Sequence, residues 1–119
     1  MQTAYADFAS RSGDIGNAIV AQDIDTLRSF SRLVIDDSFI DMVTITDNKG
    51  VVLVRGHSEK SGDTLGEGFL AVTVPLQTGK RMSGLEVING ANMMRTTSAP
   101  VRINGETVGV VVFAAMLSS

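Results

Sequence analysis

Residues 43–66 read VTITDNKGVVLVRGHSEKSGDTLG and contain two short runs of β-branched residues on either side of the polar tetrapeptide DNKG. Runs of this length and composition are typical of strands. The Asn and Gly of the tetrapeptide tolerate the positive φ angles of a tight turn. The stretch therefore predicts a β-hairpin, with strands at 39–46 and 51–55, followed by a polar loop over 57–66.

Two helices are predicted before this hairpin. Residues 3–21 carry apolar side chains at spacings of four, seven and four, which is the pattern of one helical face. Asp23 is suited to cap a second helix, which has an apolar face through Val34 and ends near residues 36–37.

The C-terminal third is predicted to be mostly β. A short helix is expected at 67–74. Pro75 is expected to end it or to start a new turn, because proline cannot donate a backbone hydrogen bond within a helix, and Gly79 is expected as a C-terminal cap. Three strands follow, at 80–88, 91–103 and 108–117, joined by Asn-Gly turns. Hairpin connections make the sheet antiparallel, so the predicted fold class is α+β: a five-stranded antiparallel sheet with the N-terminal helices on one face.

The composition suits one small globular domain. The chain has 119 residues, of which 44% are hydrophobic and 19% charged. Its net charge of −3, without a Lys/Arg cluster and without Trp, argues against a nucleic-acid partner. Cysteine is absent and histidine occurs once, which removes thiol catalysis and Cys-rich zinc sites.

No catalytic arrangement is visible in the sequence. A Ser-His-Asp triad would have to use His57, and the GxSxG pattern that exposes a nucleophilic serine is missing. The glycine-rich loop lacks the GK[ST] of a phosphate-binding loop. We therefore expect no enzymatic activity, no cofactor and no metal site in this chain.

The sequence has no apolar run of about eighteen residues, the length that spans a membrane, and no signal peptide at its start. It begins directly in a helical pattern and ends directly after a strand. We expect a segment cut from a longer receptor, with contact to the membrane only through flanking parts.

Two motifs resemble the single Cache (PAS-like) sensor domains of methyl-accepting chemotaxis receptors and sensor histidine kinases. The first is the stretch 43–66 quoted above, with its strand, acidic turn, strand, Arg-x-His and Gly-Asp. The second is MRTTSAPVRINGETVGVVVFA at 94–114. The resemblance covers nearly the whole chain and implies one sensor domain, 1–119, with helices in 1–36 and the PAS-like sheet and ligand-pocket lid in 37–119.

The resemblance also implies a function. The chain would be the periplasmic, ligand-binding part of a bacterial chemoreceptor or sensor kinase, with its first helix supporting a homodimer. The polar loop and short helix would cover a small-ligand pocket on the sheet face opposite the N-terminal helices. The last strand would continue into a membrane segment.

Two arginines lie inside otherwise apolar strands. Alternation puts Arg55 on one face with Leu53 and His57, and Arg95 on one face with Met93 and Thr97. A buried guanidinium is costly unless an anion faces it. If both arginines lie on the same sheet face, they predict a fork for a carboxylate, with His57 as a third donor.

A short carboxylate such as acetate, propionate, lactate or pyruvate suits this hypothesis. The apolar walls of the predicted pocket are Leu53, Phe69, Val72 and Met93. Alternatively, Arg55 reaches solvent or pairs with Asp47 or Asp63.

Three other polar-loop residues are predicted to be structural. Asp47 belongs to the hairpin turn, Gly62 punctuates the loop, and Asp63 is expected to hold the loop by binding backbone amides.

The sequence is also compatible with a second function. Roadblock and profilin-like interaction modules also place helices around a five-stranded sheet with a similar opening hairpin. Such a cytoplasmic module would bind a protein partner and no small ligand. The distinguishing feature is whether Arg55, His57 and Arg95 converge on one cavity.

Overall fold

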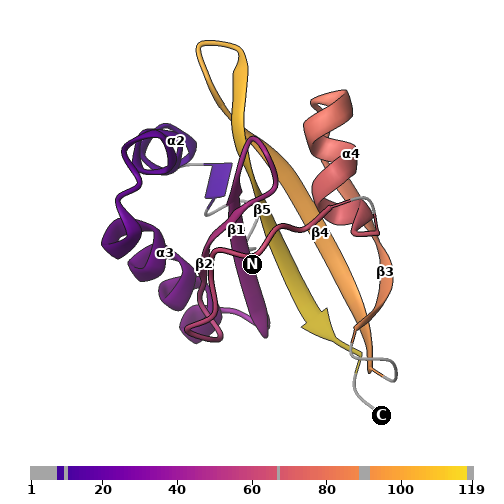
Figure 1. Ribbon diagram of the computed structural model, residues 1–119. Helices are drawn as coiled ribbons and strands as arrows, with labels where there is room; N and C mark the ends of the chain where they lie inside the picture. The colour runs from indigo at the N-terminus through magenta and orange to yellow at the C-terminus, as the bar shows by residue number, and fades with distance from the viewer. Residues whose placement is uncertain (1–7, 10, 67, 89–91, 118–119) are drawn as a thin grey trace.

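The computed structural model describes residues 8–9, 11–66, 68–88 and 92–117 (Figure 1). Its sheet has the strand order β2-β1-β5-β4-β3, with every neighbouring pair antiparallel. The predicted α+β class and five-stranded antiparallel sheet are therefore confirmed. In chain order the elements are α2 (Ser12–Ala21), α3 (Ile24–Asp37), β1 (Met42–Asp47), β2 (Val52–Arg55), α4 (Leu70–Thr78), β3 (Met82–Ile88), β4 (Asn92–Ile103) and β5 (Glu106–Met116).

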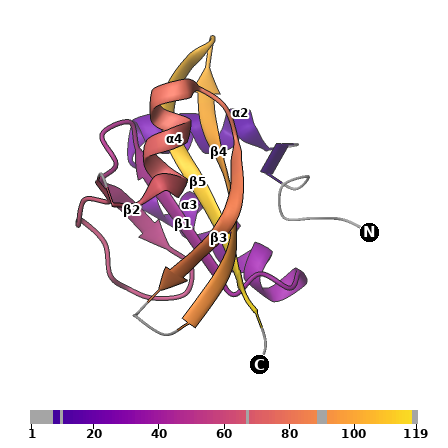
Figure 2. The ribbon, with the colours of Figure 1, turned by 90° about the vertical axis from the view of Figure 1, so that its right-hand side faces the viewer.

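Helices cover both faces of the sheet. Figures 1 and 2 show α2 and α3 on one side and α4 on the other. Alternate residues of the central strand β5 serve the two layers: Phe113 packs with α2 and α3, and Val112 packs under α4. The ring of Phe8 meets Phe113 edge-on with 6.4 Å between centroids. This double coverage explains the continuous apolar run of β5.

The second predicted helix is confirmed, including its cap. Asp23 precedes α3, and its carboxylate accepts a 3.2 Å hydrogen bond from the Thr26 amide. The first predicted helix corresponds to α2 over its second half. Residues 3–7 of that prediction lie outside the described part of the chain.

The helix α4 runs past its predicted end at residue 74, whereas the predicted cap at Gly79 is confirmed. It continues through Pro75 to Thr78, and Gly79, with a φ of 69°, caps it by donating to the Pro75 carbonyl. Ala71, Val72 and Pro75 are all buried against the sheet. One missing backbone hydrogen bond is a smaller loss than exposing this apolar face.

Both hairpin turns that fall within the described residues have the expected geometry. Asn104 and Gly105 have φ angles of 51° and 83°, as a type I′ turn requires. In the β1–β2 turn, Asp47 Oδ1 accepts hydrogen bonds from the amides of Lys49 and Val51, at 2.8 and 3.1 Å. The predicted turn at 89–90 lies outside the described residues.

A bulge interrupts the pairing of β1 with β2. Ile45 pairs with Val54, but Thr46 pairs with Val52, so Leu53 is the extra residue. A bulge shifts the facing of the side chains on either side of it. Among the described helices none is long and apolar enough to cross a membrane.

Candidate functional site

A cavity of about 350 Å³ lies on the α4 face of the sheet, where β1 and β2 meet the loop that leads to α4. Its floor comes from β1 and β2, and its walls come from residues 57–60 and from the approach to α4. The lining residues are Met42, Thr44, Arg55, His57, Ser58, Lys60, Leu65 and Phe69.

The lining divides into a polar side and an apolar side. Arg55 and Lys60 bring positive charge, and Thr44 and Ser58 bring hydroxyl groups. His57 adds a further polar group, Met42, Leu65 and Phe69 are apolar, and no acidic side chain is among the lining residues. Apolar contact combined with a few convergent polar groups is the pattern of a small-ligand site.

Arg55 is held in the cavity by Asp63. Its two terminal nitrogens donate to the two carboxylate oxygens of Asp63 at 2.8 Å each, and one of them also donates to the Lys60 carbonyl at 3.1 Å. The side chains are 13% and 30% exposed. This hydrogen-bonded pair raises the pKa of Arg55 and lowers the pKa of Asp63 to about 2. A guanidinium has five N–H donors, so the pairing leaves others for a ligand.

The Asp63 pKa predicts a specific response to acid. The folded-state pKa is about 2 against an ordinary value of 3.8, so the pair stabilises the fold above about pH 4, and this contribution is lost as the pH falls towards about 2. In Asp63→Asn the titrating group is gone. Urea titrations across this pH window should therefore show a shallower fall in the free energy of unfolding for Asp63→Asn than for the wild type. Equal slopes would contradict the prediction.

His57 lies beside Arg55 at the cavity edge. Partial burial lowers its pKa, and the positive charge of Arg55 lowers it further, while a hydrogen bond to the backbone of Val43 acts in the opposite direction. The imidazole is therefore neutral at neutral pH. It adds hydrogen-bonding capacity to the cavity rather than charge.

The loop that carries Asp63 is fastened along the free edge of β2. The Val52 amide donates to the Asp63 carbonyl and the Gly62 amide donates to the Val52 carbonyl, both at 2.8 Å. Gly62 has a φ of 88°, a conformation that suits glycine. The Asp63 carboxylate secures the loop through the guanidinium of Arg55, a pairing that the sequence left open as an alternative for Arg55. It also accepts a hydrogen bond from its own backbone amide.

The predicted fork of two arginines is wrong. Thr44 pairs with Arg55 and Val112, which places Arg55 on the α4 face. Arg95 pairs with Ala115 in a register that puts it on the face of Phe113, towards α2 and α3. Its neighbours there, Met93 and Thr97, share that face, and Arg95 is exposed while Met93 is 44% exposed. These three residues are not part of the cavity.

Two apolar residues also lie elsewhere than expected. Leu53 packs against the core under α2 and α3, because the bulge removes it from the face of Arg55. Val72 is a residue of α4 that is fully buried against Val110 and Val112 of β5, and it does not line the cavity. Of the predicted apolar walls, only Phe69 lines the cavity.

Four lining residues were not predicted: Met42, Thr44, Ser58 and Leu65. Lys60 and Lys80 were both considered from the sequence as positive charges at the mouth of the pocket, and of these only Lys60 lines the cavity. Thr44 lies directly across the hairpin from Arg55, so counting the pairing back from the DNKG turn could have found it if the bulge were known. The loop residues carry no comparable signal, because a polar loop has no periodicity that indicates which side chains point inward.

Comparison with known proteins identifies the family of this chain. Residues 2–119 match the family model dCache_3, described as the double sensory domain of two-component sensor kinase. The chain belongs to this family. The predicted Cache class is confirmed, and the dCache_3 match favours a sensory domain over the interaction module considered from the sequence. No curated protein matches the chain significantly.

The fold of this dCache_3 chain is similar to a solved structure, the sensor domain of the histidine kinase DctB of V. cholerae. The TM-score is 0.75 at 14% sequence identity, and the alignment covers 86% of this chain. The chain spans 42% of the length of the DctB chain. At this identity the likeness concerns the fold.

Proposed function

We propose that this chain is a periplasmic ligand-binding module of a bacterial sensor kinase and that its cavity binds a small carboxylate. The family match supports the sensory role. The observation that supports the ligand class is the convergence of Arg55 and Lys60 with two hydroxyl groups on a half-apolar cavity without a lining carboxylate. An anion in such a site gains charge-assisted hydrogen bonds.

The cavity suggests how a carboxylate would lie. Lys60 forms no direct ion pair within the described part of the chain, and its charge acts on the Asp63 carboxylate only as the last and smallest cause of the lowered Asp63 pKa, so its ammonium group is available to an anion. The Ser58 hydroxyl and the unused N–H groups of Arg55 add donors on the same side. Met42, Leu65 and Phe69 would then contact a short aliphatic tail.

The size of the cavity favours small acids. A volume of about 350 Å³ lies at the lower end of the range of ligand sites. Acetate, propionate, lactate and pyruvate all fit this description, and the hydroxyl groups of Thr44 and Ser58 favour acids that carry a third oxygen beyond the two of the carboxylate.

The wider context is part of the same proposal. The chain contains one five-stranded sheet and spans 42% of the DctB chain, which supports a role as one module of a double sensory domain. Both comparisons name sensor kinases, which supports a kinase output over a chemotaxis receptor. Catalysis would then belong to another part of the protein, and a homodimer through the N-terminal helix remains a prediction.

Thermal unfolding with a panel of short acids tests the ligand class. The panel contains acetate, propionate, lactate and pyruvate at millimolar concentration. At least one of these acids should raise the melting temperature of the wild type. A ligand at about 100 times its Kd stabilises a fold by about 2.7 kcal/mol. Lys60→Gln should reduce this shift, because it removes the free cation of the cavity.

Lys80→Gln is the matched control, because Lys80 is exposed beyond the end of α4 and does not line the cavity. The same charge is removed in both variants. The absence of a shift with every acid, or equal loss in both variants, would overturn the carboxylate proposal.

A further inference from the structure

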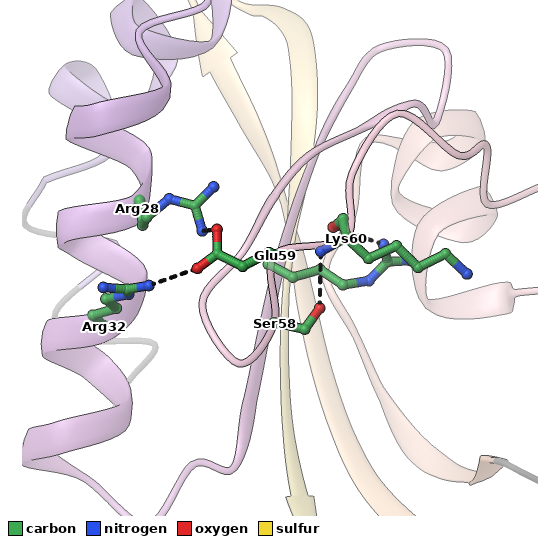
Figure 3. Close-up of polar contacts among 6 residues, drawn as sticks. Arg28, Arg32, Ser58, Glu59 and Lys60 are labelled. Atoms are coloured by element: carbon green, nitrogen blue, oxygen red, sulfur yellow. Dashed lines mark hydrogen bonds and ion pairs between the residues drawn. The ribbon is translucent and has the colours of Figure 1, made fainter.

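Residues 58–60 separate the cavity from helix α3. Ser58 and Lys60 line the cavity, and Glu59 between them faces the other way. Figure 3 shows Glu59 reaching towards α3 while the Lys60 side chain extends away from that helix. The chain bends at residue 59, and the Lys60 amide donates a 3.2 Å hydrogen bond to the Ser58 Oγ across this bend, so the position of Glu59 affects where its two neighbours lie.

Glu59 is bound by two arginines of α3. Its Oε1 lies 3.1 Å from Arg32 and accepts a hydrogen bond from it, and its Oε2 lies 3.4 Å from Arg28 (Figure 3). Arg28 and Arg32 are four residues apart, so they lie on the same face of the helix. Both carboxylate oxygens of the loop residue are therefore tied to one helix.

The wall between the cavity and α3 is thin. His57 and Ser58 line the ligand cavity on one side and a second cleft, shared with Arg32, Ile35 and Asp36, on the other. At the start of this wall, a Cβ on Gly56 would come within 2.7 Å of the Ser31 Cβ, so the backbone packs directly on α3. The loop therefore contacts α3 directly at Gly56, and beyond the cleft it is joined to α3 by the ion pairs of Glu59, whose side chain is 79% exposed.

We propose that Glu59 is a positioning residue: it holds the loop against α3 so that Ser58 and Lys60 face the cavity, and it transmits ligand-induced movement of the loop to α3. The inference rests on the proposed carboxylate site and adds the route by which occupancy reaches a helix.

The direction in which the affinity for the acid changes distinguishes a positioning role of Glu59 from a purely electrostatic effect of its charge. Glu59 is a negative charge near a cationic cavity, so by Coulomb's law its removal alone should strengthen the binding of an anion. Loss of positioning has the opposite effect, because Ser58 and Lys60 are no longer held towards the ligand. Glu59→Gln should therefore bind the best acid of the panel about three- to fivefold more weakly, the scale of exposed ion pairs.

Glu106→Gln is the matched control, since it removes the same charge at the exposed β4–β5 hairpin. Titration calorimetry with that acid gives the affinities. Glu59→Lys combined with Arg32→Glu restores a pair of opposite charges and should recover part of the lost affinity. Unchanged or tighter binding by Glu59→Gln would overturn the inference and leave the carboxylate site standing.

Hydrogen exchange supplies the second readout. In the wild type, addition of the acid should slow exchange in both the loop and α3, whereas in Glu59→Gln the change should be confined to the loop. Without ligand, Glu59→Gln should exchange faster than Glu106→Gln over residues 56–63. If the wild type binds none of the acids, the proposed function fails, and equal loop exchange in these two ligand-free variants would overturn the positioning role independently.

Discussion

Arg55→Met is expected to lose carboxylate binding, whereas Arg95→Met is expected to bind as the wild type does. Arg55 lies in the cavity floor with unused N–H donors, while Arg95 is exposed on the opposite face of the sheet. Hydrogen bonds to charged groups contribute about 1.5–3 kcal/mol each. Loss of one such bond corresponds to a fall in affinity of about 10- to 100-fold, which titration calorimetry with the best acid measures.

The same substitution is expected to lower stability. Arg55→Met leaves the Asp63 carboxylate without its two 2.8 Å hydrogen bonds and releases the loop from the edge of β2. Asp63→Asn separates the two consequences: it weakens the fastening of the loop but frees the guanidinium, so binding should persist or strengthen. Equal losses of affinity in Arg55→Met and Arg95→Met would show that neither arginine acts through the cavity.

Gly109→Ala is expected to cost the fold about 3 kcal/mol or more. Gly109 lies in β5 opposite Asp47, and an added Cβ would overlap the Thr46 carbonyl and lie 3.0 Å from Ile19 Cδ1. The strand cannot move aside, because β5 is paired with β1 on one side and β4 on the other. Such a loss is a large fraction of the stability of a typical domain.

Gly13→Ala is the matched control for this prediction. It lies in α2, where an added Cβ meets nothing within 4 Å, and alanine is the better helix former by up to about 1 kcal/mol. In urea denaturation, the free energy of unfolding should therefore fall in Gly109→Ala and rise in Gly13→Ala. A loss of less than about 1 kcal/mol in Gly109→Ala would contradict the close approach of β5 to β1.

Local features of the fold could be predicted because their causes are local. The Asp23 carboxylate caps the next turn of its own helix, and the Asn104–Gly105 pair adopts the positive φ angles that a tight hairpin needs. Pro75 shows the limit of such reasoning. The helix α4 continues past it because its apolar face is buried against strands far away in sequence.

The part of the candidate site that was predicted also depends on residues close together in the sequence. Arg55, His57 and Phe69 lie in or next to the loop that forms the cavity, so their proximity follows from the short chain distance between them. Arg95 reaches the sheet through a separate hairpin. Alternation shows that Met93, Arg95 and Thr97 share a face, but with helices on both faces of the sheet it does not show which face.

The sequence by itself therefore determined the antiparallel α+β class, the hairpin turns, the cap of α3 and the presence of a strand arginine beside a polar loop. Only the tertiary structure decided that Asp63 binds Arg55, that Arg95 faces away from the cavity and that Glu59 joins the loop to α3. The physical reason is the range of the interactions. Turns and caps are set by neighbouring residues, whereas the facing of a strand and the partner of a charge depend on register, a bulge and packing between distant segments.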